Sequence, residues 1–194
     1  MHKFAFAAVL LAGTLATPAF AQEPANVGGF HVEGLVGYDR GDIDDEDTDG
    51  VLYGVGAGYD FRAGGALLGI EGEASDSTGE ECEAGVVVAG DELCAGMGRD
   101  LYVGGRIGAV IGSSTLLYAK AGYTNARVQA DYDDGTNATL TDFSLRRNLD
   151  GIRVGAGAQF GIGPNTFIRT EYRYSNYEDG FERHQVVGGF GFRF

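Results

Sequence analysis

The sequence has no tryptophan, three prolines and two cysteines in 194 residues, and it carries only 14 Lys and Arg against 28 Asp and Glu. No basic cluster offsets this balance, which excludes a nucleic-acid partner because phosphate groups are bound by Lys and Arg. Past residue 21 there is also no apolar run of the roughly 20 residues that a spanning helix needs. If the chain crosses a membrane, it must therefore do so as a closed barrel.

Residues 1–21 have the features of a secretory signal peptide. Lys3 precedes an apolar run from Phe4 to Leu15, and Ala19-Phe20-Ala21 is a small-x-small cleavage site. A membrane anchor is the alternative, but the run is shorter than the roughly 20 residues of a spanning helix. We predict an exported mature chain of residues 22–194, whose net charge is −15 because Lys3 is removed from a chain of net charge −14.

Cys82 and Cys94 are the only cysteines. An even count in an exported chain predicts a disulfide. A zinc site is the alternative, but structural zinc usually takes four nitrogen or sulfur ligands, and the neighbouring residues offer carboxylates and no histidine. We therefore predict a Cys82–Cys94 disulfide.

In eight segments of the mature chain, every second residue is apolar, and the residues between them are mostly glycine or charged. Each segment would therefore form a strand with one apolar face and one face of glycine and charged residues. They lie at 30–38, 51–61, 66–74, 101–111, 116–124, 151–160, 167–174 and 186–194. Such lengths fit tilted transmembrane strands. Short links at 62–65, 112–115 and 161–166 alternate with longer ones near 40–50, 75–100, 127–149 and 176–184. This asymmetry is typical of outer-membrane barrels, with short turns facing the periplasm.

A soluble β-sandwich or a lipocalin-like barrel would also alternate, with its apolar residues inside. In this sequence the charged residues share their face with glycines. A barrel of about eight strands leaves little room inside, so the face of small side-chain volume is the lumen. We predict an all-β fold, an eight-stranded antiparallel up-and-down transmembrane β-barrel, in which residues 186–194 pair with residues 30–38.

The predicted lumen face carries five acids and six bases. They are Glu33, Asp60, Arg62, Glu71, Glu73, Arg106, Lys120, Arg153, Arg169, Glu171 and Arg173. Arg193 of the last segment is predicted to face the lumen as well. Unpaired buried charges are costly, so this near balance predicts a plug of mutual salt bridges. The alternative is a narrow gated pore, in which rearranged pairs open a water path.

The segment 40–50 is strongly acidic. Asp45, Asp47, Asp49 and Gly50 match the start of a calcium loop, but the motif requires a bidentate Glu six positions after the glycine, where this chain has Gly56. An EF-hand is therefore excluded. A solvated acidic loop is the expectation, and a weak divalent-cation site that bridges to lipopolysaccharide is the alternative.

Three stretches and the terminal residue carry a resemblance to a known family. GFHVEGLVGYDR, IRTEYRYSNYED, HQVVGGFGFRF and the final Phe194 resemble the OmpA-like and opacity-type outer-membrane β-barrel proteins of Gram-negative bacteria, a porin family, here with a single barrel domain. The resemblance implies a monomer in the bacterial outer membrane, in contact with lipid and lipopolysaccharide. It also implies that the barrel assembly machinery reads Phe190, Phe192 and Phe194 as a C-terminal signal.

Catalysis requires a separate test, because some barrels of this size are enzymes. A family of lipid A deacylases uses a histidine two positions before its serine, and the residue two before Ser175 is Arg173. A cluster of Ser175, Glu178 and His184 is geometrically conceivable near one strand end. We expect no catalytic site and no cofactor, and a structural and surface-interaction role in the cell envelope.

Overall fold

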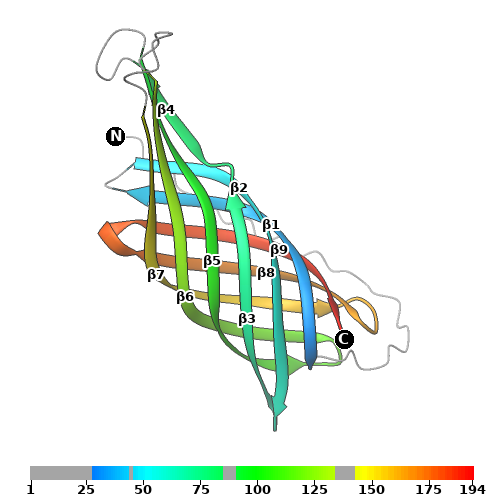
Figure 1. Cartoon of the computed structure of the whole chain (residues 1–194). Coiled ribbons are helices and arrows are strands. Elements are labelled where there is room, and N and C mark those ends of the chain that lie inside the picture. Colours follow the sequence, from blue (N-terminus) through cyan, green and yellow to red (C-terminus); the bar gives the residue numbers. More distant parts are fainter. Residues whose placement is uncertain (1–27, 44–45, 85–90, 134–142) are drawn as a thin grey trace, which may run out of the picture.

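The computed structural model of the chain is a closed β-barrel (Figure 1). The structure describes residues 28–43, 46–84, 91–133 and 143–194, so the predicted signal peptide lies outside the described residues. Eight strands form the ring, all antiparallel to their neighbours, as predicted. They are β1 (Gly29–Ile43), β2 (Glu46–Ala63), β3 (Ala66–Ser77), β5 (Glu92–Ile111), β6 (Thr115–Asp133), β7 (Phe143–Gly161), β8 (Thr166–Tyr177) and β9 (Glu182–Arg193).

The ring closes between its first and last strands. β1 pairs with β9 from His31 opposite Arg193 to Asp42 opposite Glu182, so the predicted closure is confirmed. The amide of Phe194 extends this pairing and donates a hydrogen bond of 2.8 Å to the carbonyl of Phe30. Closure satisfies the backbone groups that an open sheet edge would leave unpaired in lipid.

The three short turns lie where they are predicted. β2 and β3 are joined by residues 64–65, β5 and β6 by 112–114, and β7 and β8 by 162–165. Gly64 and Gly112 take φ values of 64° and 67°, a left-handed conformation that glycine adopts without strain. No helix among the described residues is long and apolar enough to cross a membrane.

At the opposite end the strands run farther than predicted. The hairpin of β1 and β2 continues to Ile43 opposite Glu46, so most of segment 40–50 is paired strand and not a loop. β5, β6 and β7 extend in the same way, and the short strand β4 (Glu80–Ala84) pairs with the extension of β5. The 3-10 helix η1 (Glu178–Gly180) joins β8 to β9. The predicted strands were too short because the alternation of apolar and polar residues ends at the membrane boundary, whereas backbone pairing between strands continues into water.

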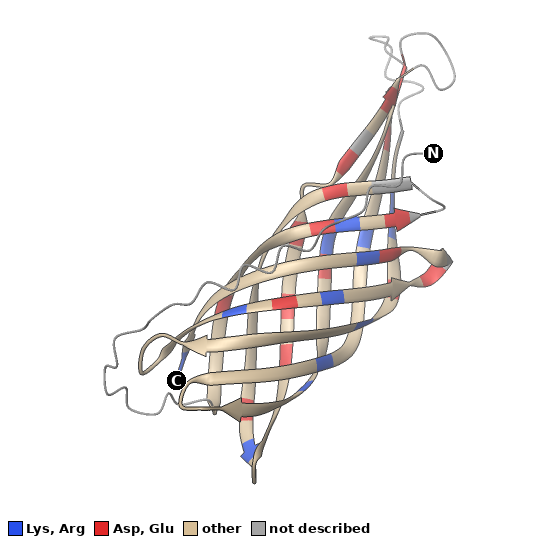
Figure 2. Cartoon of the chain, turned by 180° about the vertical axis from the view of Figure 1, so that it is seen from behind, with Lys and Arg blue, Asp and Glu red and all other residues tan. Residues whose placement is uncertain are grey.

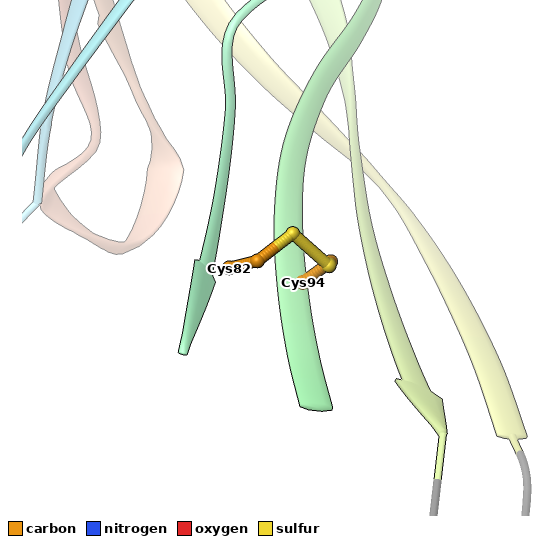
Figure 3. Close-up of a disulfide and its surroundings, with 2 residues drawn as sticks. All are labelled: Cys82 and Cys94. Carbon is orange, nitrogen blue, oxygen red and sulfur yellow. A yellow bond between two sulfur atoms is a disulfide. The ribbon is translucent and has the colours of Figure 1, made fainter. Parts of the chain in front are cut away.

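The disulfide joins β4 to β5 in this extension. Cys82 and Cys94 lie directly opposite each other in the strand register, and their sulfurs are bonded (Figure 3). The predicted pairing is therefore confirmed. Glu80 lies close to both sulfurs, but disulfide sulfurs are not the thiolates that bind a metal ion.

The outward faces of the ring strands are apolar and exposed. Val55, Val103 and Ile152 are 62%, 60% and 67% exposed, as suits side chains that contact lipid. Aromatic residues bound this apolar band at both ends, with tyrosines toward the extended strands and mostly phenylalanines toward the short turns. They include Tyr38, Tyr53, Tyr123 and Tyr172 at one end and Phe30, Phe61, Phe160 and Phe192 at the other. Among the described residues, no charged side chain lies on the outward face between the two aromatic rings.

Candidate functional site

The barrel interior holds ten of the eleven charged residues predicted there. The buried residues are Glu33, Asp60, Glu71, Glu73, Arg106, Lys120, Arg153, Arg169, Glu171 and Arg173. Acidic and basic positions are interleaved on neighbouring strands (Figure 2). Arg62 is exposed, and its assignment to the lumen was wrong. It lies beside the turn at residues 64–65, past the last interior layer of side chains.

Four further charged residues of the ring strands are buried. Asp39, Asp100, Arg183 and Arg193 raise the interior from five acids and five bases to seven of each. Arg193 belongs to the predicted lumen face, but Asp39, Asp100 and Arg183 fall outside the predicted strands. If the alternation of inward and outward side chains had been continued past the apolar residues, it would have predicted Asp39 and Asp100 to face the lumen.

The interior layer nearest the short turns is centred on Asp60. Its carboxylate accepts hydrogen bonds of 2.8 Å from Nε of Arg106 and Nη1 of Arg193. Nδ1 of the buried His31 lies 3.4 Å from the same carboxylate. Leu67, Leu116 and Tyr118 form an apolar cluster at this level. Ion-paired and apolar side chains therefore both occupy this end of the barrel interior.

The middle layer contains four glutamates, Lys120 and two arginines. Nζ of Lys120 lies 2.8 Å from carboxylate oxygens of both Glu71 and Glu73, and 3.0 Å from Glu171. Arg169 reaches Glu73 at 2.7 Å and Glu33 at 2.9 Å, and Arg173 reaches Glu73 at 2.9 Å. Most of these charges have partners on more than one strand, and the pairs of Glu73 with Arg169 and Arg173 join β3 to β8 across the barrel.

The outer layer joins Asp39 and Asp100 to two arginines. Arg183 donates to Asp39 at 3.1 Å and to Asp100 at 3.2 Å, and Arg153 forms a close ion pair with Asp100. The hydroxyl of Tyr177 donates to the same Asp100 carboxylate at 3.0 Å. An apolar cluster of Met97, Ala126, Leu149, Tyr177 and Phe181 covers this layer. Three ion-paired layers and these apolar clusters thus follow one another along the lumen.

The conceivable Ser175, Glu178 and His184 cluster does not form. Ser175 is fully buried in the interior, where it accepts a hydrogen bond of 2.8 Å from Arg153. His184 lies on the outward face, with its Nδ1 2.6 Å from the hydroxyl of Tyr172. The sheet separates the serine from the histidine, so neither can activate the other.

The acidic segment 40–50 also lacks the geometry of a calcium loop. Arg40 lies opposite Asp49 and Asp42 opposite Asp47 in a regular antiparallel ladder. A calcium loop curls its ligand positions around one point, whereas positions 47 and 49 follow each other along an extended strand. Asp44 and Asp45 lie outside the described residues.

Comparison with known proteins agrees with this architecture. The model of the outer membrane protein beta-barrel domain family matches residues 7–194. A 22 kDa outer membrane protein of Rhizobium leguminosarum bv. viciae is 28% identical over 184 residues, which cover 86% of this chain and 77% of that one. Among solved structures, Neisserial surface protein A aligns with a TM-score of 0.60 and 15% identity over 86% of this chain and 97% of that one.

A second solved structure is Ail, the attachment invasion locus protein of Yersinia pestis, in complex with the heparin analogue sucrose octasulfate. It aligns with a TM-score of 0.58 and 20% identity over 86% of this chain and 99% of that one. At these identities both structures support the fold alone.

The fold and the ion-paired interior define an integral outer-membrane β-barrel. The chain belongs to the outer membrane protein beta-barrel domain family, and it is a protein of the bacterial outer membrane.

Proposed function

We propose that this protein stabilises the outer membrane and interacts with its surroundings through its extended outer strands, and that it has neither a steady pore nor a catalytic site. The observation that carries the proposal is the ion-paired interior, in which Glu73 and Asp100 each contact two or more cations. The outer strand ends, which carry exposed acids such as Asp49 and Glu92, supply the interaction surface. Ail, the attachment invasion locus protein that shares this fold, is in keeping with such a role.

Envelope stabilisation is tested in a Gram-negative strain from which the gene for this chain is deleted. We expect the deletion strain to become more sensitive to vancomycin and to sodium dodecyl sulfate, and the wild-type gene supplied in trans to restore resistance. Unchanged sensitivity to both compounds would contradict the envelope-stabilising role.

A narrow pore for small solutes or ions is the second candidate. It is favoured by buried polar atoms that lack a hydrogen-bond partner among the described residues, including Oε2 of Glu33, Oε1 of Gln159 and Nη1 of Arg173. Such atoms could be hydrated if the ion pairs rearranged. The energetic cost of separating buried pairs makes this candidate the weaker one.

The C-terminal aromatic residues are proposed to guide assembly. Phe190, Phe192 and Phe194 are outward and exposed, and the ring of Phe194 lies 6.1 Å from that of Phe30. We further propose that the barrel is monomeric and that its acidic strand ends hold divalent cations only weakly, in bridges to lipopolysaccharide.

Deleting Phe194 should slow insertion by the barrel assembly machinery while leaving spontaneous refolding almost unchanged. The residue ends the chain outside β9, and one amide hydrogen bond joins it to Phe30. Folded barrel is measured by its altered mobility on unheated gels, in proteoliposomes with the machinery and in detergent without it. Equal rates of assisted insertion for the deletion and the wild type would contradict the assembly role.

A further inference from the structure

Three arginines lie on neighbouring strands just outside the tyrosine ring. Arg99 of β5, Arg127 of β6 and Arg146 of β7 belong to the outward face, on the extracellular side of Tyr123. The register sets their spacing, because Arg127 lies opposite Asn148 and Gln129 opposite Arg146. We call these three residues the arginine patch.

Neutral side chains bond to two of the three arginines. Nη2 of Arg99 donates to Asn125 at 2.8 Å, and Nε of Arg127 donates to Asn148 at 3.2 Å. Within the part of the chain that the structure describes, none of the three guanidinium groups forms an ion pair. Each therefore keeps most of its donors available for an anion.

Three acids flank the arginine patch, and none of them forms an ion pair with its guanidinium groups in the described part of the chain. Asp131 lies farther out on β6, and Asp150 lies at the membrane edge. Asp150 accepts hydrogen bonds from Tyr123 and from Asn125, and these bonds lower the pKa of its carboxyl group below the ordinary value. β3 pairs with β5, and Asp76 of β3 follows Ser75, which lies opposite Asp100, so Asp76 lies beside Arg99 on the outward face. The three guanidinium groups therefore lie among acids but are not paired with them.

An apolar depression in the lipid-facing surface begins at the arginine patch. Arg99 and Asn125 line its outer end, and Leu101, Val103 and Ala74 line its wall toward the membrane centre. Gly72, also in this wall, leaves the surface low there. The surface therefore offers cations at the level of lipid head groups and a shallow apolar channel at the level of acyl chains.

We propose that the arginine patch binds the phosphate groups of lipid A, the phosphorylated glycolipid of the outer leaflet, and that one acyl chain lies in the depression. Guanidinium groups bind phosphate with paired hydrogen bonds, and three of them on adjacent strands can hold one phosphorylated sugar head group. This proposal rests on the envelope-stabilising function and names the lipid that the arginine patch binds.

The direct test is titration of the refolded protein in detergent micelles with bisphosphorylated lipid A, with the bound fraction read by native mass spectrometry. EDTA is present, so that bridging by divalent cations through the acidic strand ends cannot contribute. We expect the triple variant R99Q/R127Q/R146Q to bind roughly 100-fold more weakly than the wild type, from the usual contribution of three basic residues at a charged membrane surface.

Matched controls separate the arginine patch from overall charge. Arg146→Gln should weaken binding about fivefold, whereas Arg147→Gln, which removes the next residue's charge from the opposite face of β7, should change it less than about twofold. Wild type and triple variant should bind dephosphorylated lipid A equally. Mobility on unheated gels verifies that every variant folds.

Equal binding of bisphosphorylated lipid A by the wild type and the triple variant would overturn the proposal. Loss of heparin binding in the triple variant, with lipid A binding retained, would also overturn it and assign the patch to a soluble polyanion. Either result leaves the envelope-stabilising role standing, because that role is tested on the wild-type gene in cells.

Discussion

Replacing Glu73 with glutamine should lower the free energy of unfolding by about 3–5 kcal/mol, the usual cost of removing one partner from a buried ion pair. Glu73 is held by Lys120 at 2.8 Å, Arg169 at 2.7 Å and Arg173 at 2.9 Å. The glutamine keeps the shape of the side chain but leaves these cations with too few carboxylates.

This loss is measured by urea unfolding of the protein refolded in phospholipid vesicles. Circular dichroism is the suitable signal, because the sequence has no tryptophan for fluorescence. Glu92→Gln, at an exposed acid of β5, is the control and should change stability by less than about 0.5 kcal/mol. Adding Lys120→Met to Glu73→Gln should recover at least about 1 kcal/mol, since the remaining charges are again balanced. A cost below about 1 kcal/mol for Glu73→Gln alone would show that the interior is not held by its ion pairs.

Adding one methyl group inside the barrel, by Gly122→Ala, should lower stability by about 1–3 kcal/mol. The added Cβ would overlap the carbonyl oxygen of Val103 and lie 2.5 Å from Cα of Gly104. The ring of Tyr102 covers the same two glycines, so the backbone has no free direction in which to shift.

Gly34→Ala is the matched control, because Gly34 faces lipid and an added Cβ meets nothing within 4 Å. We expect its stability to stay within about 0.5 kcal/mol of the wild type. Both variants are followed by the same urea titration, with mobility on unheated gels as the measure of folded fraction. Equal effects of the two substitutions would contradict the assignment of the glycine faces.

The period of two predicts the wall of the barrel well, because alternation of side chains is a geometric property of every strand. The alternation correctly predicted that Glu73 and Lys120 face the interior and that the first and last strands pair. It could not predict which charges form ion pairs, because Glu73 and Arg173 are 100 residues apart and meet only through the register of the whole ring.

The extended strand ends were the least predictable part. Arg183 falls in a predicted loop, and Asp100 precedes the first residue of a predicted strand, because no apolar face marks a strand that stands in water. In β5, an irregularity between Met97 and Asp100 changes the register. Met97 is consequently buried with Ala126 and Leu149, although alternation continued from residues 101–111 would turn it outward.

The central claim, that the lumen is a plug of paired charges, is tested most directly by planar-bilayer recording of the refolded wild-type protein. The protein is added beside a general porin, which serves as the positive control for insertion. We expect no steady conductance and at most rare, small openings, since opening requires buried ion pairs to separate. A steady open channel at every insertion would contradict the account and establish the protein as a pore.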